Sequence, residues 1–470
     1  MGGLSQVWIL VGVFIVSRII TILLGLHLNI WALTGYWQYL NVETLRNHLL
    51  KGLWYDHAQP PVFNLFLGLI LKIGGSESTL LFAFLLKMIT LVNSLLLFTI
   101  IKKLVTVKWL PLLVSLAYIL SPATLIFECE LFYTTTISLF LLVSVFYLIR
   151  ITASGTAWNA FGVIFPLVLL CLTRSIYHIL WLFIVVAFLL FHFRKKAVLN
   201  NLILASLTGL VLVGSWYVKN KIIFEKLTAS TWMGMNLARI VFHDNEVKDS
   251  SRIEAYEPFS GIGVYRKFID PQYENKFRGL NDLDLLQENK DDSSKNEMEV
   301  SYIPVSDLYL KASLDFIKSH PAAYVKNVLQ SSILYFTPAT VYSLASEPSN
   351  KIKYYDIGYS FNLTHHTNGK VQRRILITIS ALPKMILYLF VFIVFIRYSF
   401  QSRSITPWNL FILITIGFVF GIGSFFEHYE NMRFRFETEP LFLILASQVF
   451  SRIYSRYQLR RRPPLRELIA

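Results

Sequence analysis

Residues 177–196 read YHILWLFIVVAFLLFHFRKK, an apolar run that ends on three successive cations. A transmembrane helix needs about 17–25 predominantly apolar residues. Lys and Arg gather in the short cytoplasmic loops of membrane proteins. This stretch therefore predicts both a crossing of a bilayer and the side on which the helix ends.

Similar runs recur through the 470 residues, of which 54% are hydrophobic and 16% are charged. Soluble domains carry about 25% charged residues, and the mean hydropathy here is +0.52. The expected fold class is an all-α polytopic membrane protein. Ten segments are predicted to span the bilayer, with approximate ranges 7–26, 79–101, 109–126, 131–149, 159–173, 177–193, 200–217, 375–396, 405–425 and 438–454.

The net charge of +15 has a membrane explanation. The basic residues gather in short loops between apolar runs, which is typical of the cytoplasmic side and argues against nucleic acid as a partner. With ten spans, both termini are then predicted inside. The clusters that define this side are Lys102, Lys103 and Lys108; Arg194, Lys195 and Lys196; Arg397 and Arg403; and Arg452, Arg456, Arg460, Arg461, Arg462 and Arg466.

Parity then places five stretches on the outer face, and they hold most of the polar residues of interest. These stretches are 27–61, 127–130, 174–176, 218–374 and 426–437. The predicted organisation is an N-terminal membrane module with an outer loop, a large outer cap region, a set of C-terminal spans and a basic cytoplasmic tail. The ranges are 1–217 with the loop at 27–61, then 218–374, 375–454 and 455–470.

Four outer segments carry their own expectations. Residues 62–73 and 327–344 are apolar but short or interrupted, so we expect re-entrant or surface-lying pieces, because one further crossing would break the parity. Residues 36–55 repeat Leu and Trp at helical spacing, which predicts an amphipathic helix in the outer interface or packed on the protein. The charged residues 282–299 predict a solvated, mobile segment or a small cap.

Charged groups at membrane level are costly and mark functional hypotheses by default. Residues 54–61 read WYDHAQPP, in which Asp56, His57 and Gln59 precede two prolines that set a rigid turn. Asp56 or Glu43 could act as a general base. The alternative is an interfacial turn of ordinary polar residues.

Two carboxylates and an arginine lie at other outer edges of the predicted spans. Glu128 and Glu130 alternate along the chain, so we expect them to have different partners, or to be rim carboxylates that face water. Arg174 suits a bidentate contact with phosphate. It suits equally a structural ion pair with one of the two glutamates.

The segment 426–437 is dense in charge and leads directly into the last predicted span. Arg433 and Arg435 could clamp an anionic head group there, or form part of a charged rim. Carboxylates for proton transfer and arginines for an anion together favour a reaction on a phosphorylated, membrane-anchored substrate. The sequence has no Walker pattern, no glycine-rich dinucleotide motif and no Cys/His spacing typical of zinc.

These residues resemble the GT-C glycosyltransferases, the multi-spanning class that includes protein O-mannosyltransferases and lipid A aminoarabinose transferases. The resemblance covers most of the chain. It rests on His57-Ala58-Gln59-Pro60-Pro61 ahead of an apolar segment and on Glu430-Asn431-Met432-Arg433-Phe434 before the last helix. Glu128 with Leu131-Phe132-Tyr133, Arg174-Ser175 with His178, and STWMGMNL at 230–237 are similar to a bacterial-type branch.

The resemblance implies a GT-C-like bundle of about 10–13 transmembrane helices with an outer-face loop domain. It implies inverting transfer of a sugar from a polyprenyl-phosphate donor to a glycan, lipid or protein acceptor, at the outer face of a bacterial cytoplasmic membrane or of a eukaryotic endoplasmic reticulum. A carboxylate would take the proton while fixed cations hold the phosphate. No cofactor or metal ligand is assigned, and a divalent cation is left open. The predicted substrate-binding residues are His57, Gln59, Glu130, Arg174, His178, Trp232, Asn236, Arg433 and Arg435.

One departure bears on the base. Members of the class often have an Asp early in the first outer loop, whereas residues 38–43 read QYLNVE, with no Asp before Asp56. The candidate bases are Asp56, Glu43 and Glu128, with Asp56 first for its position beside His57. Two other functions compete: a transporter or flippase of lipid-linked or amphipathic substrates, and a non-catalytic GT-C relative.

Overall fold

The computed structural model describes residues 3–243, 249–280, 284–366, 370–402 and 405–460. Within these ranges the chain forms helices and turns, with two isolated β-bridges and no strand. The α-helices are α1 (Gly3–Leu23), α2 (Ala32–Gly35), α3 (Val42–Asn47), α4 (Leu49–Tyr55), α5 (Val62–Gly74), α6 (Ser78–Leu104), α7 (Leu110–Leu120), α8 (Pro122–Phe127), α9 (Thr134–Ala153), α10 (Ala157–Cys171), α11 (Ile179–His192), α12 (Lys196–Phe224), α13 (Met233–Val241), α14 (Tyr302–Ser319), α15 (Pro321–Tyr335), α16 (Ser346–Lys351), α17 (Lys353–Ser360), α18 (Lys370–Ser402), α19 (Pro407–Phe426) and α20 (Asn431–Arg460). The 3-10 helices are η1 (Gly75–Glu77), η2 (Ile253–Ala255), η3 (Ile262–Val264), η4 (Arg266–Phe268), η5 (Tyr273–Leu280), η6 (Asp284–Leu286), η7 (Ala339–Val341), η8 (Ser343–Ala345) and η9 (Leu363–His366).

Helices occur at all ten predicted spans, and the all-α polytopic class is confirmed. Among the described residues, six helical segments are long and apolar enough to cross a membrane: α1, α5 with α6, α9, α12, α18 and α19. Helices α7, α10 and α11 are shorter and apolar. Helix α20 holds the tenth predicted span, and charged residues make its first turns polar.

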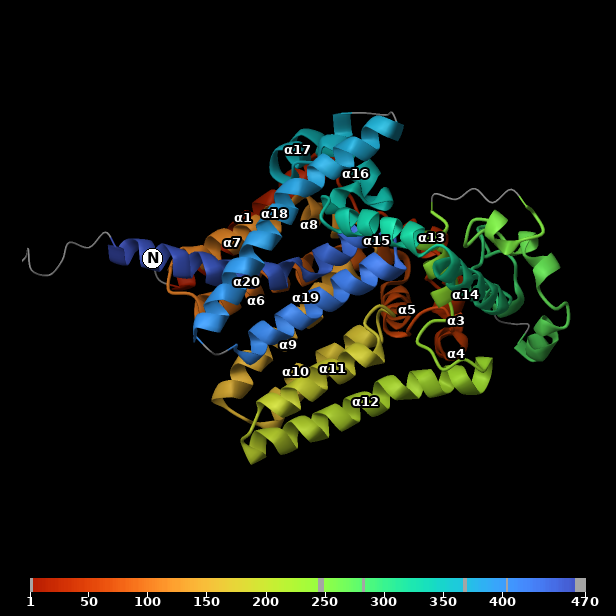
Figure 1. Cartoon of the computed structure of the whole chain (residues 1–470), viewed down its shortest axis with the longest axis horizontal. Coiled ribbons are helices and arrows are strands. Elements are labelled where there is room, and N and C mark those ends of the chain that lie inside the picture. The colour runs from red at the N-terminus through yellow and green to blue at the C-terminus, as the bar shows by residue number, and fades with distance from the viewer. Residues whose placement is uncertain (1–2, 244–248, 281–283, 367–369, 403–404, 461–470) are drawn as a thin grey trace, which may run out of the picture.

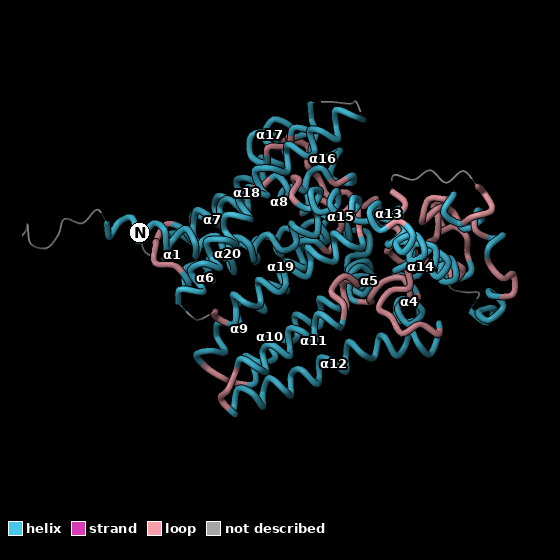
Figure 2. The backbone as a smooth tube through the Cα atoms, viewed as in Figure 1, coloured by secondary structure: helices cyan, strands magenta, loops and turns pink. Residues whose placement is uncertain are grey.

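The long helices form one bundle with two different ends (Figures 1 and 2). Helices α3, α4, α13 and α14 lie at one end, which we call the cap end. Helix α1 begins and α20 finishes at the opposite end, which we call the basic end (Figure 1). Both described termini of the bundle thus lie together, as an even number of crossings requires.

The amphipathic helix expected at 36–55 is two short helices, α3 and α4, which meet at His48. The backbone of His48 has φ −126° and ψ 30°, outside the helical region. The predicted faces are nevertheless present, because Leu45 and Leu49 are buried whereas Arg46 is exposed. Leu49 packs where α5 has Gly68, so the apolar face covers protein.

The predicted span 109–126 is broken into α7 and α8 at Ser121. Ser121 precedes Pro122 and is extended, with φ −56° and ψ 130°. A residue before proline is disfavoured in the helical region, and proline has no N–H to continue the helix. The break turns Glu128, the residue after α8, into the protein interior.

The two apolar segments that resisted the topology are both helical. Residues 62–104 form a single apolar stretch that bends at Gly75, where φ is +50° and a glycine is favoured. Residues 327–344 contain the second half of α15, and the helix ends at Tyr335 before Pro338. Helix α15 packs along α19, where the Tyr324 hydroxyl donates to the Phe425 carbonyl at 2.8 Å.

The described part of the charged segment 282–299 packs on the bundle through Lys290 and residues 296–299, which are buried, whereas residues 287–289 and 291–293 are exposed. Lys290 is buried and its Nζ donates to the carbonyls of Tyr36 and Tyr39 at 3.2 and 3.1 Å. The Met298 carbonyl contacts the His57 ring at 3.0 Å. The boundary at 217/218 is also displaced, because α12 continues to Phe224.

Candidate functional site

A cavity of about 430 Å³ lies at the cap end of the bundle. It is lined from five regions of the chain, which lie in or beside the predicted outer stretches. Its polar wall consists of Gln38, Gln59, Tyr133, Arg174, Ser175, His178, Thr228, Ser230, Asn236, Arg239, Glu427 and Glu430. Its apolar wall consists of Trp37, Ile176, Leu180, Ala229, Trp232, Met233, Phe259, Phe418, Ile422, Phe426 and Phe434.

Helix ends and short turns position these side chains. Arg174 and His178 lie in the turn between α10 and α11, and the His178 ring caps α11 by accepting the Leu180 N–H at 3.2 Å. Glu427 and Glu430 lie in the loop between α19 and α20. Met233, Asn236 and Arg239 follow at intervals of three along α13, which places them on one face of that helix.

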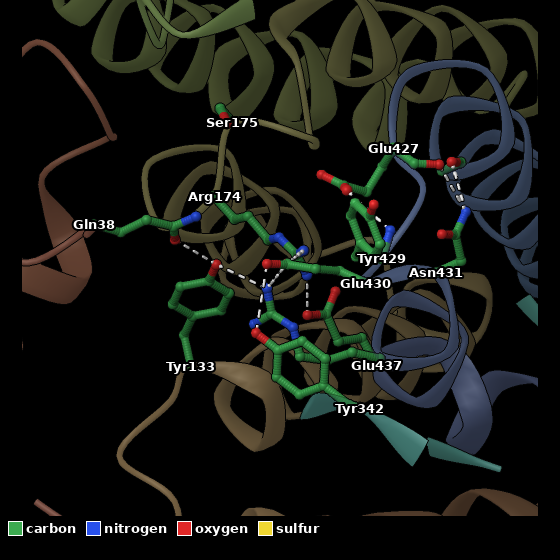
Figure 3. A network of polar contacts seen from close by, with 12 residues as sticks. Gln38, Tyr133, Arg174, Ser175, Tyr342, Glu427, Tyr429, Glu430, Asn431 and Glu437 are labelled. Atoms are coloured by element: carbon green, nitrogen blue, oxygen red, sulfur yellow. Dashed lines mark hydrogen bonds and ion pairs between the residues drawn. The ribbon is translucent and has the colours of Figure 1, made fainter. Parts of the chain in front are cut away.

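Four buried residues form an acid–arginine cluster, which we define as Arg174, Arg433, Glu430 and Glu437. Arg174 pairs with Glu437 and lies 3.5 Å from Glu430 (Figure 3). Arg433 pairs with Glu430. Arg174 and Glu430 line the cavity, whereas Arg433 and Glu437 do not. Burial alone would raise the pKa of Glu430, but Arg433, Arg174 and Arg239 outweigh it and lower that pKa.

Tyr133 lies between the two guanidinium groups of this cluster. The ring centre of Tyr133 is 5.2 Å from Cζ of Arg174 and 5.2 Å from Cζ of Arg433, which is cation–π geometry. Its hydroxyl donates to Oε1 of Gln38 at 2.7 Å (Figure 3). Tyr133 thus joins the segment 27–61 to the cluster at the cavity wall.

A second charged pair, Arg239 with Glu427, faces the cavity from α13 and from the loop before α20. Nη1 of Arg239 lies 3.2 Å from Oε1 of Glu427. The same carboxylate accepts the backbone N–H groups of His428 and Tyr429 at 2.9 and 3.2 Å. Burial raises the pKa of Glu427, and the charge of Arg239 limits that rise.

Two indole N–H groups also stand at this cavity. Trp37 and Trp232 line it, and within the described chain their Nε1 atoms are buried without a hydrogen-bond partner. Buried polar groups are normally paired. The cavity wall thus contains two tryptophans whose buried indole N–H groups have no partner among the described residues.

Five of the predicted substrate-binding residues line this cavity: Gln59, Arg174, His178, Trp232 and Asn236. The sequence interpretation missed Arg239, although the recognised motif at 230–237 ends only two residues before it. The available signal was helical spacing, since Asn236 and Arg239 are three residues apart. Glu427 and Glu430 lay within a segment considered for its arginines, and neither was assigned a role.

Asp56 and His57 do not line the cavity, and protein groups occupy their polar atoms. The Asp56 carboxylate accepts the N–H groups of Ala58 and Gln59 at 3.1 and 3.2 Å, and Nδ2 of Asn64 at 3.0 Å. Burial raises the pKa of Asp56 to about 6, and Lys219 and these donors limit the rise.

His57 joins three segments of the cap end. Its Nδ1 contacts the Thr231 hydroxyl at 2.8 Å, and its Nε2 contacts the Met298 carbonyl at 3.0 Å. Burial lowers the pKa of His57 to about 3, so the ring is neutral. The histidine of the WYDHAQPP turn therefore holds the segment 27–61 to the cap.

The remaining predicted residues lie elsewhere. Glu43 is exposed on α3, and Glu128 is paired with Arg18 at 2.7 Å. Glu130 is buried beside Asn29, and burial raises its pKa to about 8. Arg433 is buried in the acid–arginine cluster, and Arg435 is buried and pairs with Glu439. The alternative in which Arg174 pairs with Glu128 or Glu130 is wrong, because Arg174 pairs with Glu437 and Glu430.

No group of three or more His, Cys, Asp or Glu residues suited to a metal ion occurs in the described ranges. The charged side chains that line the cavity are those of Arg174, Arg239, Glu427 and Glu430. Its apolar wall includes Leu180 of α11 and Phe426 of α19, which are 58% and 38% exposed. The cavity thus combines a charged interior with an apolar flank on the outside of the bundle.

Comparison with known proteins adds little to this description. No family model matches the chain, and no curated protein matches it. Among solved structures it is similar to the archaeal oligosaccharyltransferase AglB from Archaeoglobus fulgidus, solved with an inhibitory peptide and a dolichol-phosphate, at 12% identity and a TM-score of 0.41. The match covers 98% of this chain and 52% of that protein, so the chain spans about half the length of the solved protein. A likeness at this level carries no argument about fold or activity.

Proposed function

We propose that the protein is a GT-C-type glycosyltransferase, which transfers a sugar from a polyprenyl-phosphate donor to an acceptor hydroxyl. The observation that carries the proposal is the cavity of about 430 Å³, which combines Arg174, Arg239 and Glu427 with an apolar flank on α11 and α19. Ligand pockets for small molecules have volumes of about 300–1,000 Å³. A sugar phosphate with a hydrocarbon tail fits such a division into charged and apolar parts.

Arg174 and Arg239 are the cations that line this cavity, so we assign the donor phosphate to them. Fixed cations aimed at developing negative charge stabilise a transition state. Arg174 is held by Glu437 and Glu430, and Arg239 by Glu427, so both guanidinium groups are oriented before a ligand arrives. The indole N–H groups of Trp37 and Trp232 are donors for sugar hydroxyls.

We assign the general base to Glu427, in place of Asp56, Glu43 and Glu128, because it is a carboxylate that faces the cavity and has a raised pKa. Glu430 also lines the cavity, but its lowered pKa makes it a weaker base. In the step proposed, the acceptor oxygen bonds to the anomeric carbon and its proton passes to Glu427. The bond from that carbon to the phosphate oxygen breaks, and polyprenyl phosphate leaves with inversion at carbon.

The test is lipid binding by the detergent-purified protein, followed by native mass spectrometry. We expect co-purified polyprenyl phosphate or its glycosylated form, and binding of added undecaprenyl phosphate. Arg239→Gln should weaken that binding about tenfold or more, because a charge-assisted contact contributes about 1.5–3 kcal/mol. Arg252→Gln is the matched control, since Arg252 lies exposed in the cap.

Wild-type protein that binds neither co-purified nor added polyprenyl phosphate would overturn the proposal. Equal losses in R239Q and R252Q would overturn the assignment of the phosphate to this cavity. Transfer is then measured as the release of polyprenyl phosphate from lipid-linked sugars. We expect the Glu427→Gln variant to bind the donor without releasing polyprenyl phosphate.

A further inference from the structure

A second polar cavity, of about 570 Å³, lies at the basic end of the bundle. It is formed where the end of α6, the end of α18 and the last turns of α20 meet. Its lining includes Thr106, Tyr398, Ser451, Arg452, Ser455 and Arg456. No acidic residue is present among its described lining residues. The cavity is therefore positive and rich in hydrogen-bond donors.

The two arginines of this cavity are positioned over one ring. Cζ of Arg456 lies 4.5 Å from the ring centre of Tyr398, and Cζ of Arg452 lies 5.8 Å from it. Stacking on an aromatic ring leaves the N–H groups of a guanidinium free to donate in its plane. In the described part of the chain, no carboxylate pairs with either arginine.

Three hydroxyl groups lie together in the same cavity. The Thr106 hydroxyl is 3.2 Å from the Ser451 hydroxyl and 3.2 Å from the Ser455 hydroxyl. Two arginines and three hydroxyls are the donor set that proteins present to phosphate oxygens. The arrangement differs from a loop of scattered lysines, because α6, α18 and α20 each contribute a part.

The surroundings of the cavity are apolar and aromatic. Trp109 packs edge-on against Phe450 and Tyr454, with ring centres 5.9 and 6.2 Å apart. Trp109 and Phe450 are 43% and 44% exposed. Exposed aromatic rings around a basic pocket are typical of the membrane–water interface, where head groups and the first acyl carbons meet.

We propose that this cavity binds the head-group phosphate of an anionic phospholipid, in the leaflet at the basic end. Arg452 and Arg456 bind the phosphate oxygens, the three hydroxyls donate to them as well, and the acyl chains lie against Trp109 and Phe450. The site is independent of the proposed transferase cavity, which lies at the other end of the bundle.

The test compares two double variants by native mass spectrometry of delipidated protein in detergent. Arg452→Gln with Arg456→Gln removes the two arginines of the site. Lys102→Gln with Arg397→Gln removes the same charge from exposed positions on α6 and α18 that do not line the cavity. The probes are phosphatidylglycerol, phosphatidylcholine and inorganic phosphate. All four substituted side chains are exposed, so none of the changes removes a buried contact.

We expect the wild-type protein and the Lys102/Arg397 variant to retain phosphatidylglycerol at least about tenfold better than phosphatidylcholine, and the Arg452/Arg456 variant to lose that preference. Equal losses in both double variants would show diffuse attraction of surface charge and overturn the site. Wild-type protein without preference for phosphatidylglycerol would also overturn it. Displacement of phosphatidylglycerol by equimolar inorganic phosphate would overturn the assignment to a lipid, because the acyl chains would then contribute nothing.

Discussion

The cap end contains two dense polar regions that differ in what their side chains leave available. In the turn around Asp56 and His57, the carboxylate oxygens and both ring nitrogens contact protein groups. Around Glu427 and Arg239 the charges are also paired, yet they line a cavity of about 430 Å³. A buried charge that lines a cavity is therefore a candidate for binding a ligand. A buried charge whose polar atoms are all bonded to protein groups is a candidate for a structural role.

The largest effect is expected for Glu430→Gln, because this substitution leaves Arg433 buried without its carboxylate partner. Removing one partner of a buried ion pair costs about 3–5 kcal/mol. We expect a large fall in melting temperature. The measurement is tryptophan fluorescence during heating, with both proteins in the same detergent. Glu288→Gln, at an exposed pair with Arg266, is the control and should change little. A small effect of E430Q would contradict the view that the cluster stabilises the cap end.

Arg239→Gln should separate function from folding. Removal of one fixed donor that stabilises developing negative charge lowers the rate about 10²–10³-fold, which is about 2.7–4 kcal/mol in activation free energy. We expect that loss in sugar transfer, with a melting temperature near that of the wild type, because the Glu427 carboxylate lines the cavity and keeps two backbone N–H donors when Arg239 is replaced. A parallel loss of transfer and of melting temperature would assign Arg239 to the structural group instead.

His57→Gln tests the turn around Asp56 and His57, whose polar atoms are bonded to protein groups. Removal of the buried contacts to Thr231 and Met298 should cost about 1–3 kcal/mol of stability. Transfer per folded molecule should be retained, since His57 does not line the cavity. Abolished transfer in folded H57Q protein would place this residue in the reaction.

The same residue makes a prediction about pH. The pKa of His57 is lowered from 6.5 to about 3 in the fold, so below pH 6.5 the unfolded chain binds a proton that the native ring does not. The contribution of the neutral His57 ring to the free energy of unfolding is therefore complete above pH 6.5. It falls between pH 6.5 and 3, by up to about 1.4 kcal/mol per pH unit. Melting temperatures at pH 7 and pH 5 should differ less for H57Q than for the wild type.

The smallest effect is expected at the cap surface. Lys226 and Asp307 form a close pair at 2.6 Å, but their side chains are 37% and 51% exposed. Exposed pairs contribute about 0–1 kcal/mol. Lys226→Ala should leave melting temperature and transfer within error of the wild type. A larger effect would show that the cap depends on its surface pairs.

Much of the bundle could be predicted from sequence, because a bilayer forces long apolar helices and basic loops. Positions 179–192 and 407–426 are examples in which hydropathy alone located a helix. The cap could not be predicted in the same way. Lys290 is charged and lies in a polar run, yet it is buried because its Nζ donates hydrogen bonds to three backbone carbonyl groups of another segment.

The candidate site was predictable in part for the same reason. Arg174 and His178 are polar residues at the end of an apolar run, and position alone made them conspicuous. Arg239 was missed because α13 is short and unremarkable in composition, and only its packing against Glu427 and Trp37 gives the side chain a role. Helical spacing from Asn236 indicates the face on which Arg239 lies, but Glu427 and Trp37 are far from it in the sequence.

The ion pair between Arg174 and Glu437 has a consequence for how the protein is made. Helix α20 enters the bundle with Arg433, Arg435, Glu437 and Glu439 in its first turns, and charged residues oppose the insertion of a helix into lipid. Its partner Arg174 belongs to a turn synthesised more than 250 residues earlier. We expect the last helix to integrate against an already assembled bundle, so that biogenesis ends with the step that also completes the cavity wall.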